Sequence, residues 1–420
     1  MKVEELKVYQ YIIDHIDQVF KEPRAFIKHP FIDPGSVYNG NVWDWDTYWS
    51  VYGLISFAKS YQNKEFNEKL ILHSKGNVFN FLDHQLEDGY IPMMIELGEW
   101  DEPYLNKKRK EGIMMNMHKP FLCQQIVLIS EFIQDYDWIK DYVDQLTRYF
   151  ECYDKNYYFE HQGLYVWCDD IMIGMDNDPA SFGRPKFSTA NIFLNSFMVM
   201  EFEAMAKILS KCKRSDEIQK MFHNKKEALS KAIQDECWDE RDGFFYSVDV
   251  DIKTRPFEWI HQGLGVFWKS LPIKIRTWSG FLPLLAGIAT DKQAQRLLEH
   301  AMDPNTFMSP YGITSLAKDE KMFNLSVTNN PSNWLGPIWL VVNYAVFKGL
   351  LDYNYQEEAR DLCKRTIDLL EKDLMTTGSL HEYYNPFNGH PVMNGGFVNW
   401  NILVLNMIED LRIYGIISLS

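Results

Sequence analysis

The first chemistry-bearing cluster is an aromatic and acidic run at residues 38–49. Three tryptophans and two aspartates fall within seven residues of it. A sugar site needs this mixture, because flat aromatic faces cover the C–H surface of a sugar ring and carboxylates accept hydrogen bonds from its hydroxyls. The alternative is a helix N-terminus with Asp44 or Asp46 as its cap and the tryptophans as core. The sugar site is favoured, since aspartates among tryptophans inside a core would need partners.

A second cluster places four aspartates within ten residues, in a loop that starts near Trp167. The four are Asp169, Asp170, Asp176 and Asp178. Carboxylates packed together raise one another's pKa, and burial raises it further, so that one of them can stay protonated near neutral pH. A protonated carboxylic acid is what a general acid requires. A solvated acidic loop is the alternative, and composition alone does not separate the two.

Two further clusters combine aromatic side chains with amides, glycines and a glutamate. Residues 333–339 read Asn-Trp-Leu-Gly-Pro-Ile-Trp and open an apolar helix, with Pro337 expected in its first turn. Glu382 is flanked by rings and precedes an Asn-Pro-Phe-Asn-Gly loop, and a Gly-Gly-Phe-Val-Asn-Trp run ends at Trp400. A carboxylate in aromatic surroundings is either paired or functional. The alternatives are core packing for the first cluster and a surface glutamate for the second.

Motifs for other chemistries are absent from the sequence. It has no HExxH, GxGxxG, Walker A or GxSxG pattern, and its eleven histidines are scattered. We therefore predict neither a metal nor another cofactor. The six cysteines form no CxxC pair and are expected to be reduced thiols.

The composition favours a folded protein that acts away from nucleic acids and membranes. Of its 420 residues 46% are apolar and 24% charged, which excludes disorder. The formal charge of −15 argues against a nucleic-acid partner. We find neither a stretch long enough to span a membrane nor a signal peptide, so the expected location is the cytoplasm. The expected partner is a small carbohydrate, and a homo-oligomer stays open.

The clusters must be positioned by helices, because the apolar periodicity is helical almost throughout. The clearest case is residues 190–210, with Ser188 and Thr189 as expected N-caps. We predict about twelve helical segments, at 3–20, 44–62, 65–86, 119–135, 139–156, 189–212, 214–236, 276–287, 291–302, 333–352, 354–373 and 395–414.

The predicted helices come in pairs joined by short turns, and short turns make antiparallel neighbours. The segment at 334–352 is very apolar, whereas 354–373 is charged on one side, as expected of an inner helix wrapped by an outer one. Six such pairs predict an all-α fold, an (α/α)6 barrel or six-hairpin toroid, as a single domain over residues 1–420. Asp-Gly dipeptides at 88–89 and 242–243 predict short β-hairpin insertions.

Taken in order along the chain, the clusters resemble glycoside hydrolase family 63 and, more distantly, the trehalases. The resemblance covers residues 35–412, and without a further β-rich domain the chain is similar to compact bacterial members that act on glucosylglycerate or mannosylglycerate. It is carried by five motifs: Gly-Met-Asp-Asn at 174–177, Asn-Trp-Leu-Gly-Pro-Ile-Trp at 333–339, Glu-Tyr-Tyr-Asn-Pro-Phe-Asn-Gly at 382–389, Gln-Leu-Glu-Asp-Gly-Tyr-Ile-Pro at 85–92 and the tryptophan cluster at 43–49.

The resemblance implies an α-glycosidase that inverts the anomeric centre. It assigns the general acid to Asp176 and the general base to Glu382, and it implies the same (α/α)6 barrel. In such a reaction the acid protonates the leaving oxygen while the base activates a water on the opposite face of the ring. The predicted substrate-binding residues are Tyr38, Trp43, Asp44, Trp45, Asp46, Lys119, Gln124, Trp167, Asn177, Trp334, Gly336, Trp339 and Trp400.

Two departures from the family pattern bear on the substrate. At the place of a Gln-Pro-Pro stretch common in the family, residues 116–121 read Asn-Met-His-Lys-Pro-Phe, which brings in His118 and Lys119, and an arginine after the acid motif is displaced to Arg184. These cations could receive the carboxylate of a glycerate leaving group. A neutral α-glucodisaccharide such as trehalose is the other expectation.

Other functions on the same toroid stay open at this point. A sugar epimerase or lyase would use a histidine as proton carrier, and His161, His261 or His381 could serve. A sugar-binding protein without catalysis is a third class, although it would not need both Asp176 and Glu382. Whether the loop at 96–116 forms a lid over the site is also open.

Overall fold

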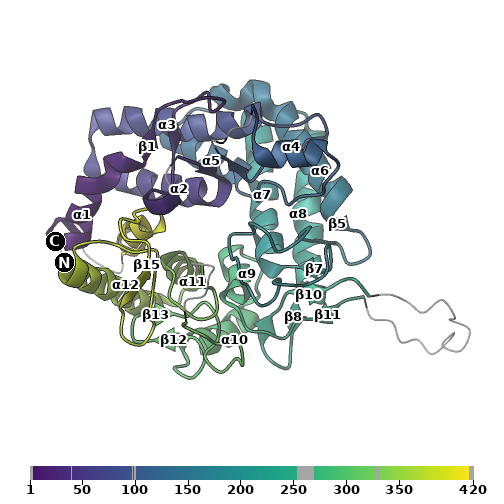
Figure 1. Ribbon diagram of the computed structural model, residues 1–420. Coiled ribbons are helices and arrows are strands. Elements are labelled where there is room, and N and C mark those ends of the chain that lie inside the picture. The colour runs from purple at the N-terminus through teal and green to yellow at the C-terminus, as the bar shows by residue number, and fades with distance from the viewer. Residues whose placement is uncertain are drawn as a thin grey trace, which may run out of the picture.

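The computed structural model describes residues 3–38, 40–96, 98, 101–252, 269–326 and 332–415. This part of the chain is mostly helical with a few short strands, as Figure 1 shows. The expectation of a helical protein with short β-hairpins is confirmed. Each predicted helical segment contains a helix there, and α4 (Tyr104–Lys110) adds one that the periodicity did not predict.

Six of the described helices contact one another in a closed ring. The contacts run from α2 to α5, α7, α9, α11, α13 and back to α2. These helices are rich in buried residues, which is why their sequences are apolar around most of the circumference. Their bounds are α2 (Asp44–Tyr61), α5 (Leu122–Ile133), α7 (Ile192–Lys211), α9 (Leu282–Leu285), α11 (Leu340–Asp352) and α13 (Leu403–Ile413).

A second set of helices alternates with the ring along the chain and packs around it (Figure 1). The first of them, α1, packs on the last, α12, and the backbone N–H of Val8 donates to Glu371 Oε1 at 2.8 Å. The helices of this set are α1 (Lys7–His15), α3 (Lys64–Asp83), α6 (Val143–Tyr157), α8 (Asp216–Glu236), α10 (Asp291–Met302) and α12 (Gln356–Thr377).

The described strands are two or three residues long, and all of their pairings are antiparallel. The pairs are β1 (Phe20–Lys21) with β2 (Phe31–Ile32), β3 (Val42–Trp43) with β4 (Met94–Ile95), β5 (Tyr158–Phe159) with β6 (Leu164–Tyr165), β8 (Trp238–Asp239) with β9 (Phe244–Phe245), β12 (Met308–Ser309) with β13 (Gly312–Ile313), and β14 (Tyr383–Tyr384) with β15 (Pro391–Met393). A three-stranded sheet has the order β11 (Leu271–Pro272), β10 (Val248–Asp249), β7 (Thr189–Ala190). The Asp-Gly at 242–243 turns the β8–β9 hairpin as predicted, whereas the turn at 88–89 has no strands beside it.

Several predicted helix starts are wrong. The helix expected from residue 395 begins at Leu403, after a short 3-10 helix at Trp400–Ile402. The helix expected from residue 333 begins at Leu340, so Pro337 lies before it. The reason is competing pairing, because Ile338 exchanges backbone hydrogen bonds with Tyr384 of β14. Similarly, Thr189 is drawn into a strand and the cap of α7 is Asn191, whose side chain accepts from the N–H of Phe193 at 2.8 Å.

All six cysteines lie in the described part of the chain, where they are buried and unbonded to one another. Within the same residues, no helix is long and apolar enough to cross a membrane.

Candidate active site

The predicted site residues converge where the chain enters five of the ring helices. Trp43 and Asp46 lie at the start of α2, Lys119 precedes α5, and Trp339 and Trp400 precede α11 and α13. They enclose a cavity of about 290 Å³, which the loop before α7 also lines. The N-termini of these helices therefore meet at one end of the ring. The cavity is lined by Tyr38, Trp43, Trp45, Asp46, Lys119, Met172, Gly174, Asp176, Ser332, Trp339, Glu382 and Trp400.

Glu382 is a buried carboxylate held by two side-chain donors. Its Oε1 accepts a hydrogen bond from Tyr38 Oη at 2.9 Å, and its Oε2 accepts one from Asn394 Nδ2. Burial raises the pKa of Glu382 to about 7, the bonds from Asn394 and Tyr38 oppose that rise, and the nearby Asp176 adds to it. A carboxyl with a pKa near neutrality is suited to proton transfer.

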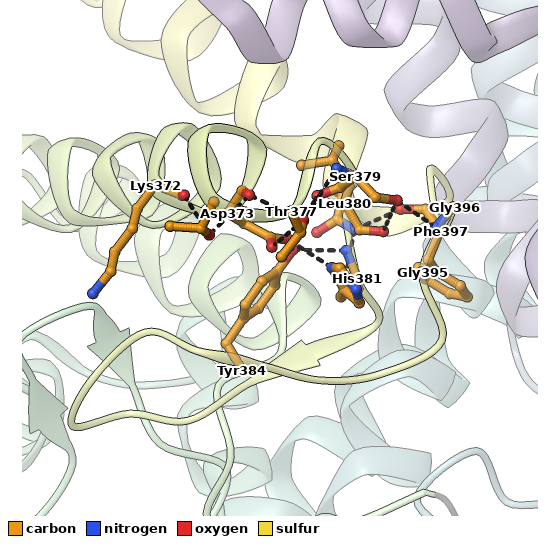
Figure 2. A network of polar contacts seen from close by, with 12 residues as sticks. Lys372, Asp373, Thr377, Ser379, Leu380, His381, Tyr384, Gly395, Gly396 and Phe397 are labelled. Atoms are coloured by element: carbon orange, nitrogen blue, oxygen red, sulfur yellow. Dashed lines mark hydrogen bonds and ion pairs between the residues drawn. The ribbon is translucent and has the colours of Figure 1, made fainter.

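A buried polar network stands directly behind Glu382. The carboxylate of Asp373, on α12, accepts from Tyr384 Oη at 3.0 Å, and Nδ1 of His381 lies 2.9 Å from it. Tyr384 Oη in turn accepts the backbone N–H of His381 at 2.9 Å. Figure 2 shows these side chains gathered with Ser379 and Gly396 at the end of α12. The network fixes the backbone on both sides of Glu382.

Asp176 lies on a loop that passes closely over the start of α2. Gly174 on this loop has a φ of +93°, and a Cβ there would stand 3.3 Å from the ring of Trp45, so glycine fits best. The next residue after Asp176, Asn177, donates to Asn333 Oδ1 at 3.1 Å and accepts from the N–H of Trp334 at 2.6 Å. Asn177 thus ties the loop of Asp176 to the segment before α11 and does not itself line the cavity.

The three rival aspartates of this loop have other partners and do not line the cavity. Asp169 pairs with Lys186 at 3.2 Å, and Asp170 accepts the N–H of Gly183 at 2.7 Å. Asp178 is buried and accepts from the side chains of Ser181 and Asn191, and burial raises its pKa to about 6. Of the four, Asp176 is the one that faces the cavity.

Asp46 is the third carboxyl at the cavity. Its Oδ1 accepts from Asn399 Nδ2 at 2.6 Å. Burial raises the pKa of Asp46 to about 8, Lys119 acts against the rise, and Asp44 and Glu382 add to it. At neutral pH its side chain can therefore both donate to and accept from a sugar hydroxyl.

Asp44 does not line the cavity but pairs with Lys119, which does. Its Oδ1 accepts from Lys119 Nζ at 2.9 Å, and its Oδ2 accepts the backbone N–H of Lys119 at 2.7 Å. Both side chains are almost fully buried. Asp44 therefore holds a lining residue in place and does not form the lining itself.

Aromatic rings build the walls. Trp45 meets Trp400 edge to face with ring centroids 6.0 Å apart. Trp339 stacks on Trp334 at 4.0 Å and on Tyr383 at 4.5 Å. Trp334 supports the wall from behind and does not line the cavity. Flat faces held this rigidly suit the apolar side of a sugar ring.

Three more predicted residues do not line the cavity. Gln124 donates to the carbonyl oxygens of Pro120 and Phe197 inside the ring. Trp167 is buried against the helix core. Gly336 has a φ of +141°, and a Cβ there would stand 2.5 Å from the ring of Phe323, so its role is close packing.

Several lining or supporting residues were not predicted, namely Met172, Gly174, Ser332, Asn394 and Asn399. Asn399 lies one residue before Trp400, and an amide beside an aromatic wall residue was the signal that could have found it. Gly174 opens the Gly-Met-Asp-Asn motif at 174–177, whereas Met172, Ser332 and Asn394 carry no distinctive pattern in the sequence.

The cations expected for a carboxylate are engaged elsewhere. His118 is buried in edge contact with Phe81, and burial lowers its pKa to about 4. Arg184 pairs with Asp249 of β10 and is absent from the cavity lining. Of the three, only Lys119 lines the cavity, and it is already paired with Asp44.

Histidines do not line the cavity within the described residues. His161 is exposed on the β5–β6 turn, His381 lies in the network behind Glu382, and His261 lies outside the described residues. The loop at 96–116 contains α4, and Arg109 on it pairs with Asp88 at 2.7 Å. No group of three or more potential ligand side chains that could hold a metal ion occurs in the described ranges.

The cavity thus holds two carboxyl groups from distant segments, Asp176 and Glu382, and a third, Asp46, beside the aromatic walls. A scan against family profiles adds that the mannosylglycerate hydrolase MGH1-like glycoside hydrolase domain matches residues 39–400. The chain belongs to this family. The resemblance to glycoside hydrolase family 63, with trehalases more distant, is thereby confirmed. Several relatives of this glycoside hydrolase domain carry the names of hydrolases and glucosidases.

Two curated relatives illustrate the range. A probable mannosyl-oligosaccharide glucosidase of Schizosaccharomyces pombe is 25% identical over 299 residues, covering 67% of this chain and 34% of the relative. The mannosylglycerate hydrolase MGH1 of Selaginella moellendorffii is 29% identical over 166 residues, covering 39% of this chain and 30% of the relative. The match with this glycoside hydrolase chain thus spans about a third of these relatives' length.

Solved structures share the fold of this glycoside hydrolase domain. The family 63 mannosylglycerate hydrolase of Thermus thermophilus, solved with glucose, matches with a TM-score of 0.69 at 18% identity, over 95% of this chain and 99% of that one. The neutral trehalase of Saccharomyces cerevisiae matches with a TM-score of 0.59 at 17% identity, over 92% of this chain and 76% of that one.

Proposed function

We propose that the chain is an inverting α-glycosidase that hydrolyses a small α-glucoside or α-mannoside. The observation that carries the proposal is the cavity that Asp176 and Glu382 share, with Asp46 and tryptophan walls beside them. In the proposed reaction Asp176 protonates the leaving oxygen as its bond to the anomeric carbon breaks. Glu382 takes a proton from the water whose oxygen forms the new bond on the opposite face.

The immediate surroundings of the two residues support these roles. Burial raises the pKa of Glu382 to about 7, so its carboxyl is mostly ionised above about pH 7. Side-chain donors hold both of its oxygens and so fix its orientation. The loop of Asp176 is fixed through Asn177 and Gly174. The cavity volume of about 290 Å³ is at the small end for ligand sites, which supports a single sugar unit as the bound glycone.

The leaving group is either glycerate or a second sugar. Relatives named mannosylglycerate hydrolases support glycerate, and a relative named mannosyl-oligosaccharide glucosidase supports a neutral glycoside. Pairing of Lys119 with Asp44 and of Arg184 with Asp249 weighs toward the neutral glycoside. We propose glycosides of both kinds as candidate substrates.

The architecture and location are part of the same proposal. We infer that the closed ring and the helices around it form the (α/α)6 barrel as one catalytic domain over residues 1–420, in the cytoplasm. The alternating order of ring and outer helices supports the barrel. The epimerase or lyase alternative has less support, since neither His161 nor His381 reaches the cavity.

The test is a hydrolysis screen of the purified protein. The panel contains α-glucosyl and α-mannosyl glycerate, trehalose, kojibiose, nigerose, maltose and isomaltose, with released sugar as the readout. We expect one substrate to be cleaved, and Asp176→Asn to lower its rate of cleavage by about 10²- to 10⁴-fold while Asp170→Asn, on the same loop, does not. Cleavage by Asp176→Asn at the wild-type rate would refute the assignment. Isomerised sugar without cleavage would support the epimerase.

A further inference from the structure

Lys119 is a buried cation on the wall of the sugar cavity. Its side chain is 2% exposed, and it lines the cavity together with Asp46 and Trp45. The lysine is therefore a feature of this chain that needs its own explanation.

Lys119 is held through its backbone and its stem as well as through the bond from Nζ to Asp44 Oδ1. The backbone N–H of Lys119 donates to Asp44 Oδ2 at 2.7 Å, and its carbonyl oxygen accepts from Tyr149 Oη at 3.0 Å. Its Cε lies 3.6 Å from the place of a Cβ on Gly174, so the acid loop covers the aliphatic stem. A donor held from both sides in this way is preorganised for a ligand.

Packing alone does not account for a buried ion pair. Two buried charges cost more desolvation energy than well-packed apolar side chains of the same volume. An ammonium group has three protons, and among the described residues Asp44 Oδ1 is the acceptor found for Nζ. A sugar in the cavity would offer hydroxyl oxygens to the remaining protons.

Resting on the proposed function, we propose that Lys119 is a specificity-determining residue that donates to a hydroxyl oxygen of the bound glycone. Asp44 neutralises the ammonium charge, so the cavity selects a neutral hexose over a uronic acid. Asp46, on the same wall, pairs with a neighbouring hydroxyl and completes a donor and acceptor couple. Discrimination by such a couple is strong, because a sugar that lacks the hydroxyl leaves a buried donor unpaired.

The first arm of the test measures sugar binding through the fluorescence of the cavity tryptophans. Glucose, mannose and their monodeoxy forms are titrated into the wild type and Lys119→Met. In the wild type we expect one deoxy position to weaken binding about 10- to 100-fold, as for a hydrogen bond to a charged group. In Lys119→Met the parent sugar should weaken by the same factor, and the deoxy sugar should lose nothing more. Additive losses would overturn the proposal.

The second arm tests the charge. The wild type should bind glucose more tightly than glucuronate. Asp44→Asn leaves an uncompensated ammonium and should reverse this preference. Tighter binding of glucuronate by the wild type, or an unchanged preference in Asp44→Asn, would contradict the proposed neutralisation.

Two controls keep the outcomes separate. Lys207→Met removes an ion-paired lysine 44% exposed on α7, and it should bind every sugar as the wild type does. The double variant Asp44→Asn with Lys119→Met avoids a lone buried charge. If Lys119→Met alone fails to fold, the double variant should show the same loss of discrimination between the parent sugar and its deoxy form. A wild type that binds no sugar would refute the proposed function itself, whereas binding without any contribution from Lys119 refutes this inference alone.

Discussion

Glu201 and Glu382 are both buried glutamates whose pKa burial raises to about 7, yet they lie in different surroundings. Glu201, on α7, accepts the backbone N–H groups of Cys123 and Gln124 at 2.7 and 3.1 Å. It thus satisfies donors in the first turn of α5, which a helix leaves free. Glu382 accepts from the side chains of Tyr38 and Asn394 and faces the cavity.

A raised pKa therefore does not by itself mark a catalytic group. Buried structural carboxylates have the same property, and access to a cavity separates the two cases. Glu201 is buried between two ring helices, α7 and α5, and does not line the cavity. Glu382 keeps an open approach beside Asp176. Substitution of Glu382 should therefore lower the catalytic rate, whereas substitution of Glu201 should lower the stability of the fold.

The largest expected effect is on the rate. Asp176→Asn and Glu382→Gln should each lower kcat by about 10²- to 10⁴-fold, because each removes a proton-transfer group. Steady-state kinetics on the substrate found in the screen measure this loss. An α-glycosyl fluoride needs no protonation of its leaving group, so Asp176→Asn should retain activity on it and Glu382→Gln should not. Equal loss of both variants on the fluoride would contradict the division of roles.

Glu201→Leu should act on stability. It leaves two backbone N–H groups at the start of α5 without acceptors, which costs on the order of 2–4 kcal/mol. Denaturant unfolding measures the loss, and kcat per folded molecule should stay within a few-fold of the wild type. Glu203→Gln, at an exposed position on the same helix, should change stability by less than about 0.5 kcal/mol. A selective loss of rate in Glu201→Leu would remove the distinction between the two glutamates.

Stability should depend on pH through Glu382. A carboxyl with a higher pKa folded than unfolded makes the folded state less stable as pH rises from 4.5 to about 7, because the unfolded chain releases its proton first. Glu382→Gln lacks this titration and should be more stable than the wild type by about 1–3 kcal/mol at pH 8, with no such advantage at pH 4. Thermal unfolding across this range, with the exposed Glu217→Gln as control, measures the difference. An advantage that is independent of pH would refute the account.

The smallest effect is expected behind Glu382. Tyr384→Phe removes the hydroxyl that joins Asp373 to the backbone of His381. We expect kcat to fall less than about 10-fold with KM unchanged, together with about 1 kcal/mol of stability. If KM rises instead and kcat is kept, the network does not position the base.

The sequence predicted which segments are helical better than it predicted where each helix begins. Helical periodicity identified every ring helix, because an apolar stripe of period 3.6 is a strong local signal. It missed the start of α11, because the pairing of Ile338 with Tyr384 depends on residues far along the chain. It also missed α4, which is only seven residues long.

The site was predictable where family motifs exist and unpredictable where contacts are long-range. Asp176 and Glu382 were chosen by their motifs, since composition left four aspartates equal. The pair of Lys119 with Asp44 joins residues 75 positions apart, and no spacing rule connects them. The same holds for Asn394, which lies outside the motifs and donates to Glu382, 12 positions earlier in the chain.

The decisive measurement is the anomer that appears first. An α-glucosyl or α-mannosyl fluoride is hydrolysed by the wild type inside a proton NMR spectrometer, and the product is read before it mutarotates. We expect the β-anomer to accumulate first, because a water activated by Glu382 attacks the face opposite the leaving group. Initial release of the α-anomer would show retention and contradict the assignment of Glu382 as a general base.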